Sequence, residues 1–447
     1  MPYTEMDNIT LTKLALISER ARKDPKFQFT SLAHLLNEGF LKECYFGLGR
    51  DRASGIDGVS WKEYGERLDE NISDLVARMK AKRYKPQPSR RVYIPKDEHS
   101  KRPLGLPALE DKIVQKGIAR ILEAIYEQDF LDCSYGFRPN RGCHGALTAV
   151  DKAIWRDRIS YVIEADIKRF FDNVSHDWML RCLQVHILDP SLLLLIRRFL
   201  KAGYIDAGEF VLTAEGTPQG GNLSPILSNI FLHYVLDLWF EKKIKPKVRG
   251  ACHLVRYADD FVCMAQYFDD AQYIEQAMQQ RFAKFNLELN PEKTRIVDFG
   301  SKGRGNVNQE GQHRPRTFDF LGFTHYLGKS LKGNWVLCRK TSSKRLRRAC
   351  KELAMWLKMI RSSAKLKEWW PMLQMKLRGH YQYYGISGNS RAMAHYCYIT
   401  DHLILKWLNR RCQKVSFSWK GYRAYLKHYP LPKPRIVHRL YTPSSDS

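Results

Sequence analysis

The chain has 447 residues, of which 44% are apolar and 12% are aromatic. This length suffices for two or three domains, and this composition excludes a mainly disordered chain. The 74 basic and 47 acidic residues give a net charge of +27, which indicates a polyanionic partner, either nucleic acid or an anionic membrane surface. Residues 340–447 contain 23 basic and 4 acidic residues, a net of +19, a concentration that predicts an electrostatic docking module.

Targeting and cysteine patterns narrow the class further. The ten cysteines occur singly, without the paired spacing of zinc sites, so we expect free thiols in a reducing cytoplasm. No apolar run has the length of a transmembrane helix, and residues 1–8 include two acids and no apolar core of a signal peptide. The sequence therefore predicts a cytoplasmic protein without a membrane partner.

The hydrophobic periodicity predicts two kinds of architecture along the chain. Predicted helices span residues 10–22, 32–48, 68–82, 111–127 and 225–242, and predicted strands span 90–94, 161–166, 254–257 and 261–264. After residue 326 the pattern becomes helical and basic until about residue 411. We expect a mixed α+β part followed by an all-helical basic unit.

Three acids lie at the ends of predicted strands. Asp259 and Asp260 separate two apolar strands, as at the tip of a β-hairpin, and Asp166 ends an earlier apolar strand. An Asp-Asp turn or a strand-end cap alone is compatible with a structural role. Three carboxylates on neighbouring strands can instead bind two Mg²⁺ ions, which activate a 3′-hydroxyl and stabilise a leaving pyrophosphate.

Ordered motifs along the chain carry a family resemblance. Asp166, then Pro218-Gln219-Gly220, then Tyr257-Ala258-Asp259-Asp260 resemble the palm motifs of reverse transcriptases. More closely, the chain is similar to the group II intron reverse transcriptase/maturase family. The matching segments are Gly55–Gly58, Arg102–Pro107, Tyr135–Pro139, Phe170–Asp172, Phe320–Phe323, Leu377–Tyr381 and Leu431–Ile436, so the resemblance covers nearly the whole chain.

The resemblance implies a fold and an activity. The fold is a right-hand polymerase, with an N-terminal helical extension (1–48), fingers and palm (49–330) and an all-helical thumb/maturase domain (331–447). The activity is RNA-directed DNA synthesis with Mg²⁺ and dNTPs on an RNA template and a DNA primer. The implied further role is assistance to group II intron RNA in splicing and in mobility into target DNA, in the bacterial cytoplasm. The sequence has no segment resembling the family's His-Asn-His nuclease, so we expect no cleavage of target DNA by this chain.

The resemblance also implies roles for single residues. Asp166 and Asp259 are the principal metal ligands, with the Ile167 carbonyl assisting and Asp260 completing the triad. Phe171 excludes a nucleotide 2′-hydroxyl, unless it is simply a core aromatic. The remaining nucleotide-binding residues are Lys96 and Arg102 on the triphosphate, Gln219 in the pocket, and Lys293, which either protonates the pyrophosphate or is an ordinary salt-bridged lysine.

The basic C-terminal unit has its own candidate RNA-binding residues. Arg345, Arg347, Arg348 and Lys351 crowd one predicted helix, and Arg378 lies in the maturase segment. The aromatics Trp369, Trp370, Tyr381, Tyr383 and Tyr384 interleave with the charges, and rings can stack on unpaired bases. Because large aromatics often form cores, we expect about half of them to be buried.

Two other functions are compatible with these observations. The first is a free-standing relative recruited for DNA repair or phage defence, without an intron partner. The second is a non-catalytic RNA-binding splicing factor, which the intact set of Asp166, Asp259 and Asp260 argues against.

Overall fold

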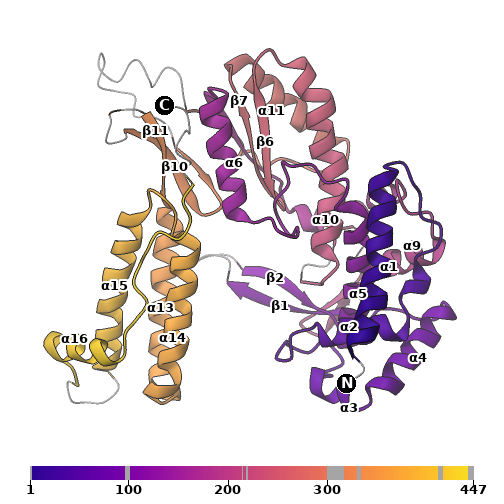
Figure 1. The fold of residues 1–447 in the computed structure, drawn as a ribbon, viewed down its shortest axis with the longest axis horizontal. Coiled ribbons are helices and arrows are strands. Elements are labelled where there is room, and N and C mark those ends of the chain that lie inside the picture. Colours follow the sequence, from indigo (N-terminus) through magenta and orange to yellow (C-terminus); the bar gives the residue numbers. More distant parts are fainter. Residues whose placement is uncertain are drawn as a thin grey trace.

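The structure is a computed structural model that describes residues 3–95, 101–213, 215–217, 220–299, 317–329, 333, 335–410 and 416–440. Within these residues the strands form three sheets, and four helices near the C-terminus stand beside them as a bundle (Figure 1). Lys96 and Gln219, two of the predicted nucleotide-binding residues, lie outside the described residues. The mixed order followed by a helical bundle confirms the predicted α+β fold class.

The central sheet carries the three predicted carboxylates. Its strands are β3 (Tyr161–Asp166), β6 (Cys252–Tyr257), β7 (Asp260–Ala265) and β8 (Arg295–Asp298), in the antiparallel order β6-β7-β3-β8. Successive side chains of a strand point to opposite faces, so Val162 joins one hydrophobic core and Ile163 joins another. Burial on both faces explains why these strands are continuously apolar instead of alternating.

Helices cover both faces of this sheet. One face packs against α11 (Phe268–Ala283), and the other packs against α6 (Cys143–Arg156). Next to α11 runs α10 (Ser224–Leu232), which continues through two π-helical segments, His233–Asp237 and Phe240–Ile244, and the short 3₁₀ turn Lys245–Lys247. The long helix predicted over residues 225–242 is therefore present, with π-helical geometry in its second half.

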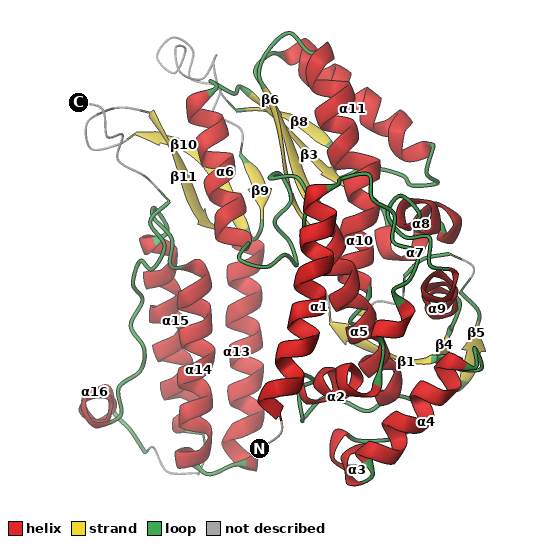
Figure 2. Cartoon of the chain, turned by 45° about the vertical axis from the view of Figure 1, so that its right-hand side comes forward, coloured by secondary structure: helices red, strands yellow, loops and turns green. Residues whose placement is uncertain are grey.

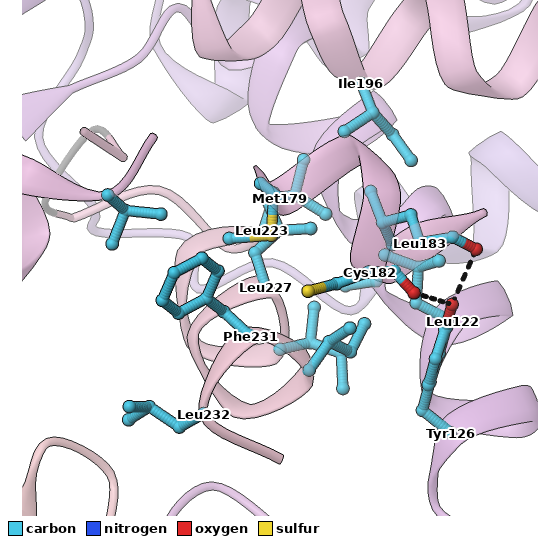
Figure 3. Packing of buried hydrophobic residues seen from close by; sticks show 14 of the residues in the cluster. Leu122, Tyr126, Met179, Cys182, Leu183, Ile196, Leu223, Leu227, Phe231 and Leu232 are labelled. Atoms are coloured by element: carbon cyan, nitrogen blue, oxygen red, sulfur yellow. Dashed lines mark hydrogen bonds between the residues drawn. The ribbon is translucent and has the colours of Figure 1, made fainter. Parts of the chain in front are cut away.

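The largest core lies beneath the sheet and extends to the N-terminal helices. Figure 3 shows Leu122 and Tyr126 of α5 (Leu109–Tyr126) among apolar side chains of α8 (His176–Leu183), α9 (Pro190–Leu200) and α10. The Tyr126 hydroxyl donates to the Leu183 carbonyl (2.8 Å), which satisfies its polar group inside the core. The remaining helices of this part are α1 (Tyr3–Lys23), the 3₁₀ helix Ala33–Leu35, α2 (Glu38–Phe46), α3 (Trp61–Glu66), α4 (Leu68–Lys80) and α7 (Phe170–Asn173).

The N-terminal segment differs from the single helix predicted over residues 32–48. The Asn37 side chain accepts the Phe40 N–H (3.0 Å) and starts α2, so the preceding residues form only a 3₁₀ turn. Residues of this segment, such as Leu41, belong to the same core as α5. Residues 1–48 thus share their described packing with the part that follows them.

A second sheet lies beside α5. It comprises β1 (Ser89–Pro95), β2 (Lys101–Leu106), β4 (Tyr204–Asp206) and β5 (Glu209–Val211), in the order β2-β1-β4-β5. Strands β1 and β2 are antiparallel, whereas β1 and β4 are parallel. In Figure 1, β1 and β2 lie below the central sheet, between the helical bundle and the N-terminal helices.

A third sheet corrects the expectation of helix directly after residue 326. Strands β9 (Phe318–Phe320), β10 (Phe323–Lys329) and β11 (Trp335–Thr341) pair in the order β11-β10-β9. The boundary expected at residue 330 falls inside this sheet, because β11 pairs with β10 along its length. Alternate residues of β10 (Phe323, His325, Leu327) are buried, a period of two that favours a strand over a helix. The helices begin only at Ser343.

Four helices form the C-terminal bundle, α13 (Ser343–Ser363), α14 (Leu366–Tyr384), α15 (Ser390–Leu408) and α16 (Trp419–His428). They enclose a separate core that includes Leu357, Trp369 and Leu373. In Figures 1 and 2, α16 lies on the side of α15 that faces away from the central sheet. None of the described helices is both long enough and apolar enough to cross a membrane.

Candidate active site

Three carboxylates meet at one edge of the central sheet. Asp166 ends β3, and the register pairs it with Asp260, the first residue of β7. Tyr257 pairs with Asp260 across the β6–β7 hairpin, so Ala258 and Asp259 form its two-residue tip. The predicted hairpin with Asp259 at its tip and Asp166 on a neighbouring strand is confirmed, whereas Asp260, also predicted at the tip, is the first residue of β7.

The hairpin tip is a strained turn. Ala258 has φ +58°, in the left-handed region that favours glycine, and it is only 6% exposed. A non-glycine residue keeps such a conformation only where the surrounding structure enforces it. Gly136 supplies part of this enforcement, because a Cβ at Gly136 would collide with the main-chain nitrogen of Ala258 and lie 3.0 Å from the carbonyl carbon of Tyr257.

A buried ion pair between Arg256 and Asp237 holds the same turn in place from the interior of the protein. Arg256 is fully buried and binds Asp237 through Nε–Oδ1 (2.8 Å) and Nη2–Oδ2 (2.5 Å). Its Nη1 also donates to the Ala258 carbonyl (3.0 Å) and to Asn229 Oδ1 (3.0 Å). The Arg256 main chain pairs with the segment before Gly136, since its carbonyl accepts the Tyr135 N–H (2.8 Å).

The sequence motifs do not indicate this support for the hairpin tip. An arginine within an apolar strand is a usable signal, since arginine is almost never fully buried without a partner. Its partner Asp237 lies in a π-helical segment, and such segments occur frequently at functional sites. The pairing itself spans two elements and follows only from the fold.

The carboxylates repel one another. Surrounding protein atoms and then the negative charges of Asp259 and Asp166 raise the pKa of Asp260 to about 7, while the Leu321 N–H and the positive charge of Arg345 oppose this shift. The Asp260 side chain is nevertheless exposed at the surface of the sheet edge. Because water reaches this side chain, the repulsion between the acids outweighs the loss of hydration at Asp260. The edge therefore attracts cations.

A lysine already lies against one of these acids. Lys293 Nζ is 2.7 Å from Asp166 Oδ2, and both side chains are about half exposed. The loop that bears Lys293 is fixed to the strand end, because the Asn290 N–H donates to the Asp166 carbonyl (2.7 Å). The ionic contact fits the alternative of a salt-bridged lysine that the sequence left open, and it places Lys293 at the carboxylate edge, the edge of the central sheet that bears Asp166, Asp259 and Asp260.

Oxygen donors suited to Mg²⁺ are present at this edge. Among the described residues, however, no three acidic, histidine or cysteine side chains converge into a ready-made metal site. Ile167 is buried beside Asp166, and the main-chain hydrogen bonds of its bridge to Leu289 are made by its neighbours Asp166 and Lys168. The donor chemistry and the repulsion between the acids fit a divalent cation, with Lys293 as a competing charge.

The loop before Gln219 packs on Phe171. The Thr217 N–H donates to the Phe171 carbonyl (2.7 Å), and Gly216, at φ +91°, lies where a Cβ would be 2.6 Å from the same oxygen. The Phe171 ring is partly buried and contacts the ring of Phe170 at 5.2 Å between centroids. This position is compatible with both interpretations of Phe171, exclusion of a nucleotide 2′-hydroxyl and packing as a core aromatic.

The other side of this loop contacts the β1–β2 hairpin. A Cβ at Gly220 would lie 2.5 Å from the Gly105 carbonyl, so the loop returns against β2. Arg102 is exposed on β2, opposite Ile94 of β1. One end of this loop thus contacts Phe171, and the other end contacts the strand that carries Arg102.

The cations of α13 lie near the central sheet and near the sheet that contains β1. Arg345 is exposed on the first turn, close enough to lower the pKa of Asp260. Arg348 Nη2 donates to the Pro95 carbonyl at the end of β1 (3.3 Å), and its Nε donates to Glu352 (2.6 Å). Arg347, Lys351 and, on α14, Arg378 are exposed.

The aromatics considered for base stacking lie in cores. Trp369, Trp370 and Tyr381 are 1–4% exposed, and Tyr383 and Tyr384 pack against the third sheet. Three of the five rings are buried and two are partly buried, which agrees with the expectation that about half would be buried.

Comparisons with known proteins agree with this geometry. Residues 94–325 match the family model for reverse transcriptase (RNA-dependent DNA polymerase). The chain is 28% identical to the group II intron-encoded protein LtrA of Lactococcus lactis subsp. cremoris over 472 residues, covering 89% of this chain and 77% of that protein. It is 32% identical to protein YkfC of Escherichia coli K12 over 325 residues, covering 63% of this chain and 84% of that protein.

A third relative matches over a shorter region. A 91 kDa protein in the cob intron of Schizosaccharomyces pombe is 40% identical over 234 residues, which cover 52% of this chain and 29% of that protein. The family model spans the carboxylate edge, the Phe171 loop and strand β2 together. The chain therefore belongs to the reverse transcriptase family, in the group that includes group II intron-encoded proteins, and is an RNA-directed DNA polymerase.

Proposed function

We propose that Asp166, Asp259 and Asp260, with the Ile167 carbonyl, bind two Mg²⁺ ions. The observation that carries this proposal is the strand register, which pairs Asp166 with Asp260 beside the hairpin tip that bears Asp259. When bound, such ions lower the pKa of a 3′-hydroxyl and stabilise the charge of a leaving pyrophosphate. The chain itself supplies a rigid hairpin, because Arg256 and Gly136 prevent the tip from relaxing.

The nucleotide pocket lies between the carboxylates and β2. Phe171 stands five residues after Asp166, and the loop bonded to its carbonyl returns to β2, which carries Arg102. In this arrangement Arg102 binds triphosphate oxygens and Phe171 excludes the 2′-hydroxyl. Lys293 stays near the departing phosphates, and Lys96 and Gln219 retain the pocket roles that the resemblance implies.

The N-terminal half of α13 is the proposed interface for the template and primer. Arg345, Arg347, Arg348 and Lys351 project within three turns of one helix, which begins next to Asp260 and contacts the end of β1. Positive charge along a helix that spans two sheets fits a phosphate backbone. Arg378 on α14 adds to this charge. We assign the part of the chain that precedes the third sheet, from residue 49, to fingers and palm and the bundle to thumb and maturase functions.

We further propose that the partners include group II intron RNA, a DNA primer and target DNA. The relative named group II intron-encoded protein LtrA aligns over most of this chain and supports an intron role, with assistance to splicing. The relative YkfC carries no intron in its name, so a free-standing role in repair or phage defence remains the alternative. The RNA flanking the gene distinguishes the two, since a group II intron has a defined secondary structure.

Primer extension tests the carboxylate assignment. Asp259→Asn and Asp166→Asn each remove a charged ligand, so we expect extension of a DNA primer on an RNA template to fall at least 100-fold, while RNA affinity is retained. Asp298→Asn is the matched control, because Asp298 lies at the opposite end of the sheet, paired with Tyr161. Binding of Mn²⁺ measured by electron paramagnetic resonance supplies a second readout, with two ions per chain expected and fewer in either variant. Extension by Asp259→Asn at the parent rate contradicts the assignment.

A salt titration tests the α13 interface. Each phosphate contact changes the slope of log affinity against log salt by about 0.7 to 0.9. Replacing Arg345, Arg347 and Arg348 together by Gln should therefore flatten this slope for a template–primer duplex by about 2. A parent-like slope contradicts the interface. The control is the same replacement of Lys62, Lys80 and Lys82, which are basic residues of the N-terminal part.

A further inference from the structure

An exposed cluster of three aromatic rings lies on α15 and α16. Tyr398 is 63% exposed and Trp419 is 41% exposed, whereas most large aromatics of the bundle are buried or partly buried. The ring of His402 lies between them, with centroids 4.2 Å from Tyr398 and 4.7 Å from Trp419. His402 Nδ1 bonds the Tyr398 carbonyl (2.8 Å), which fixes the ring orientation. Three rings are thus held in contact with each other and with solvent.

Positive charges continue the line of these rings. Tyr398, His402 and Lys406 follow one another at steps of four residues along α15 and so share one side of the helix, and Arg410 follows in the turn after the helix ends. Lys406 Nζ and the guanidinium carbons of Arg410 and Arg361 lie 5.5, 5.6 and 5.0 Å from the centroid of the Trp407 ring. Three cations therefore surround one indole near the C-terminal end of α15.

These cations have no carboxylate partner that offsets their repulsion in the described part of the chain. The ion pairs of that part include none of the three, and Arg361 donates instead to the carbonyls of Lys358 and Arg410. The half-buried carboxylate of Asp401 on α15 accepts the Tyr422 hydroxyl (3.2 Å). Arg361 also borders an open hollow of about 730 Å³, lined by Lys365, by the serines 362, 363 and 416, and by one acid, Glu368. Such a gathering of like charges favours a polyanion.

We propose that this surface, the outer face formed by Tyr398, His402, Trp419, Lys406, Arg410 and Arg361, binds an unpaired stretch of RNA. Exposed rings stack on bases, and the adjacent cations contact the phosphates that follow. An unpaired strand is required because bases in a duplex are already stacked on each other. The proposal rests on the proposed RNA partner, and it adds a second contact surface to the α13 interface.

The outer face is separate from the carboxylate edge of the central sheet. Arg345 stands on the first turn of α13, and Arg361 stands on its last turn, 16 residues and about 24 Å further along the helix. In Figures 1 and 2, α16 lies on the side of α15 that faces away from the central sheet. An RNA bound to the outer face therefore leaves the carboxylate edge accessible to a template and primer.

Binding of a short unstructured RNA to the full chain tests the proposal. The probe is a fluorescent oligouridylate of about ten nucleotides, and its anisotropy is measured after the α13 interface has been saturated with an unlabelled RNA–DNA duplex. Tyr398→Ala with His402→Ala should weaken binding roughly tenfold or more, since one stacked base contributes about 1–3 kcal/mol. Tyr398→Phe keeps the ring and should bind as the parent does. The matched control is Phe210→Ala, which removes an equally exposed ring from β5.

The charges are tested separately. Lys406→Gln with Arg410→Gln should reduce the slope of log affinity against log salt for the same probe by about 1.4. Parent-like affinity of the double alanine variant with the duplex in place overturns the proposal, as does an equal loss in the Phe210 control. Primer extension is followed in parallel and should be unchanged in these variants. If the parent binds the probe through these rings but extends no primer, the proposed catalytic assignment fails and the outer face stands.

Discussion

Arg256 and Asp237 form an ion pair in which neither side chain is exposed, directly beneath the turn that presents Asp259. The guanidinium also donates to the Ala258 carbonyl, so the pair connects a π-helical segment to the β6–β7 hairpin. The pair therefore contributes to the stability of the fold and to the geometry of the hairpin tip.

Arg256→Gln should lower the free energy of unfolding by about 3–5 kcal/mol, because Asp237 is left as a buried, unpaired charge. Urea denaturation measures this change. Arg67→Gln breaks the exposed pair with Glu70 and should cost no more than about 1 kcal/mol. Equal effects of the two variants would contradict the structural importance of the buried pair. Asp237→Asn with Arg256→Gln should be less harmful than Arg256→Gln alone, since no unpaired charge remains.

Gly136→Ala should displace the hairpin. The added Cβ meets the main chain of Ala258 and Tyr257, which cannot move as a flexible side chain can. We expect primer extension to fall about 100-fold, as a displacement near 1 Å at reacting groups can cause, with a stability loss of about 1–3 kcal/mol. Gly379→Ala is the control, because that glycine lies within α14 with open space around it and should gain about 1 kcal/mol in stability. A Gly136→Ala variant of parent activity would show that the turn is not fixed from this side.

The elements with clear periodicity could be predicted from the sequence. The strand that ends at Asp166 has its predicted bounds, because six residues with four apolar side chains allow little else. The hairpin tip at Asp259 follows from two apolar runs separated by acids. The third sheet could not be predicted in the same way, since β11 includes Arg339 and Lys340 and resembles the basic helices that follow it.

Contacts between distant elements could not be read from the sequence. Arg256 lies next to a recognised motif, but its partner Asp237 belongs to a helix predicted only as apolar. Trp369 and Tyr398 look alike in the sequence as aromatics among charges, yet one is buried in the bundle and the other is exposed. Which face of a helix is covered depends on how the bundle packs.

Phe171→Ala should increase the use of ribonucleotides relative to deoxyribonucleotides. The ring stands five residues beyond Asp166, and its carbonyl anchors the loop at Thr217, so truncation opens space without releasing the loop. The ratio of kcat/KM for each ribonucleotide and deoxyribonucleotide measures the effect. An unchanged ratio in a folded variant would indicate that Phe171 has only a structural role beside Phe170. In that case the Phe171→Ala variant should have a lower free energy of unfolding.

Acid should destabilise the chain through His233. This side chain is 2% exposed, and burial lowers its pKa from 6.5 to about 4. Between these pH values the unfolded chain binds a proton that the folded chain does not, so stability is complete above pH 6.5 and falls as the pH drops toward 4. At pH 5 the loss is about 2 kcal/mol.

His233→Gln removes the group and should therefore reduce the difference in unfolding free energy between pH 7 and pH 5. His428→Gln, at the exposed end of α16, should leave this difference unchanged. Other buried histidines contribute to the total, so the comparison is between the two variants. Identical pH profiles for them would contradict the role of His233.

Lys293 should act on the metal dependence of the reaction. Its ammonium lies 2.7 Å from Asp166, where it competes with a divalent cation for the same carboxylate. Lys293→Gln should consequently shift the Mg²⁺ midpoint of primer extension to lower concentration. If the lysine also protonates the leaving pyrophosphate, the rate at saturating Mg²⁺ falls by at least tenfold, since general acid catalysis contributes 10²–10⁴-fold. We expect both changes.

Lys168→Gln is the matched control for this variant. Lys168 follows Asp166 by two residues and forms a similarly exposed pair with Glu288 (3.1 Å), so it tests the general loss of a positive charge near the edge. Neither change should alter stability by more than about 1 kcal/mol, because water screens exposed pairs. A lower midpoint for Lys293→Gln but not for Lys168→Gln identifies competition at Asp166. A midpoint unchanged in both variants, measured by Mn²⁺ binding as well as by extension, means that the lysine leaves Asp166 before the cation arrives, and its role is then confined to the phosphates.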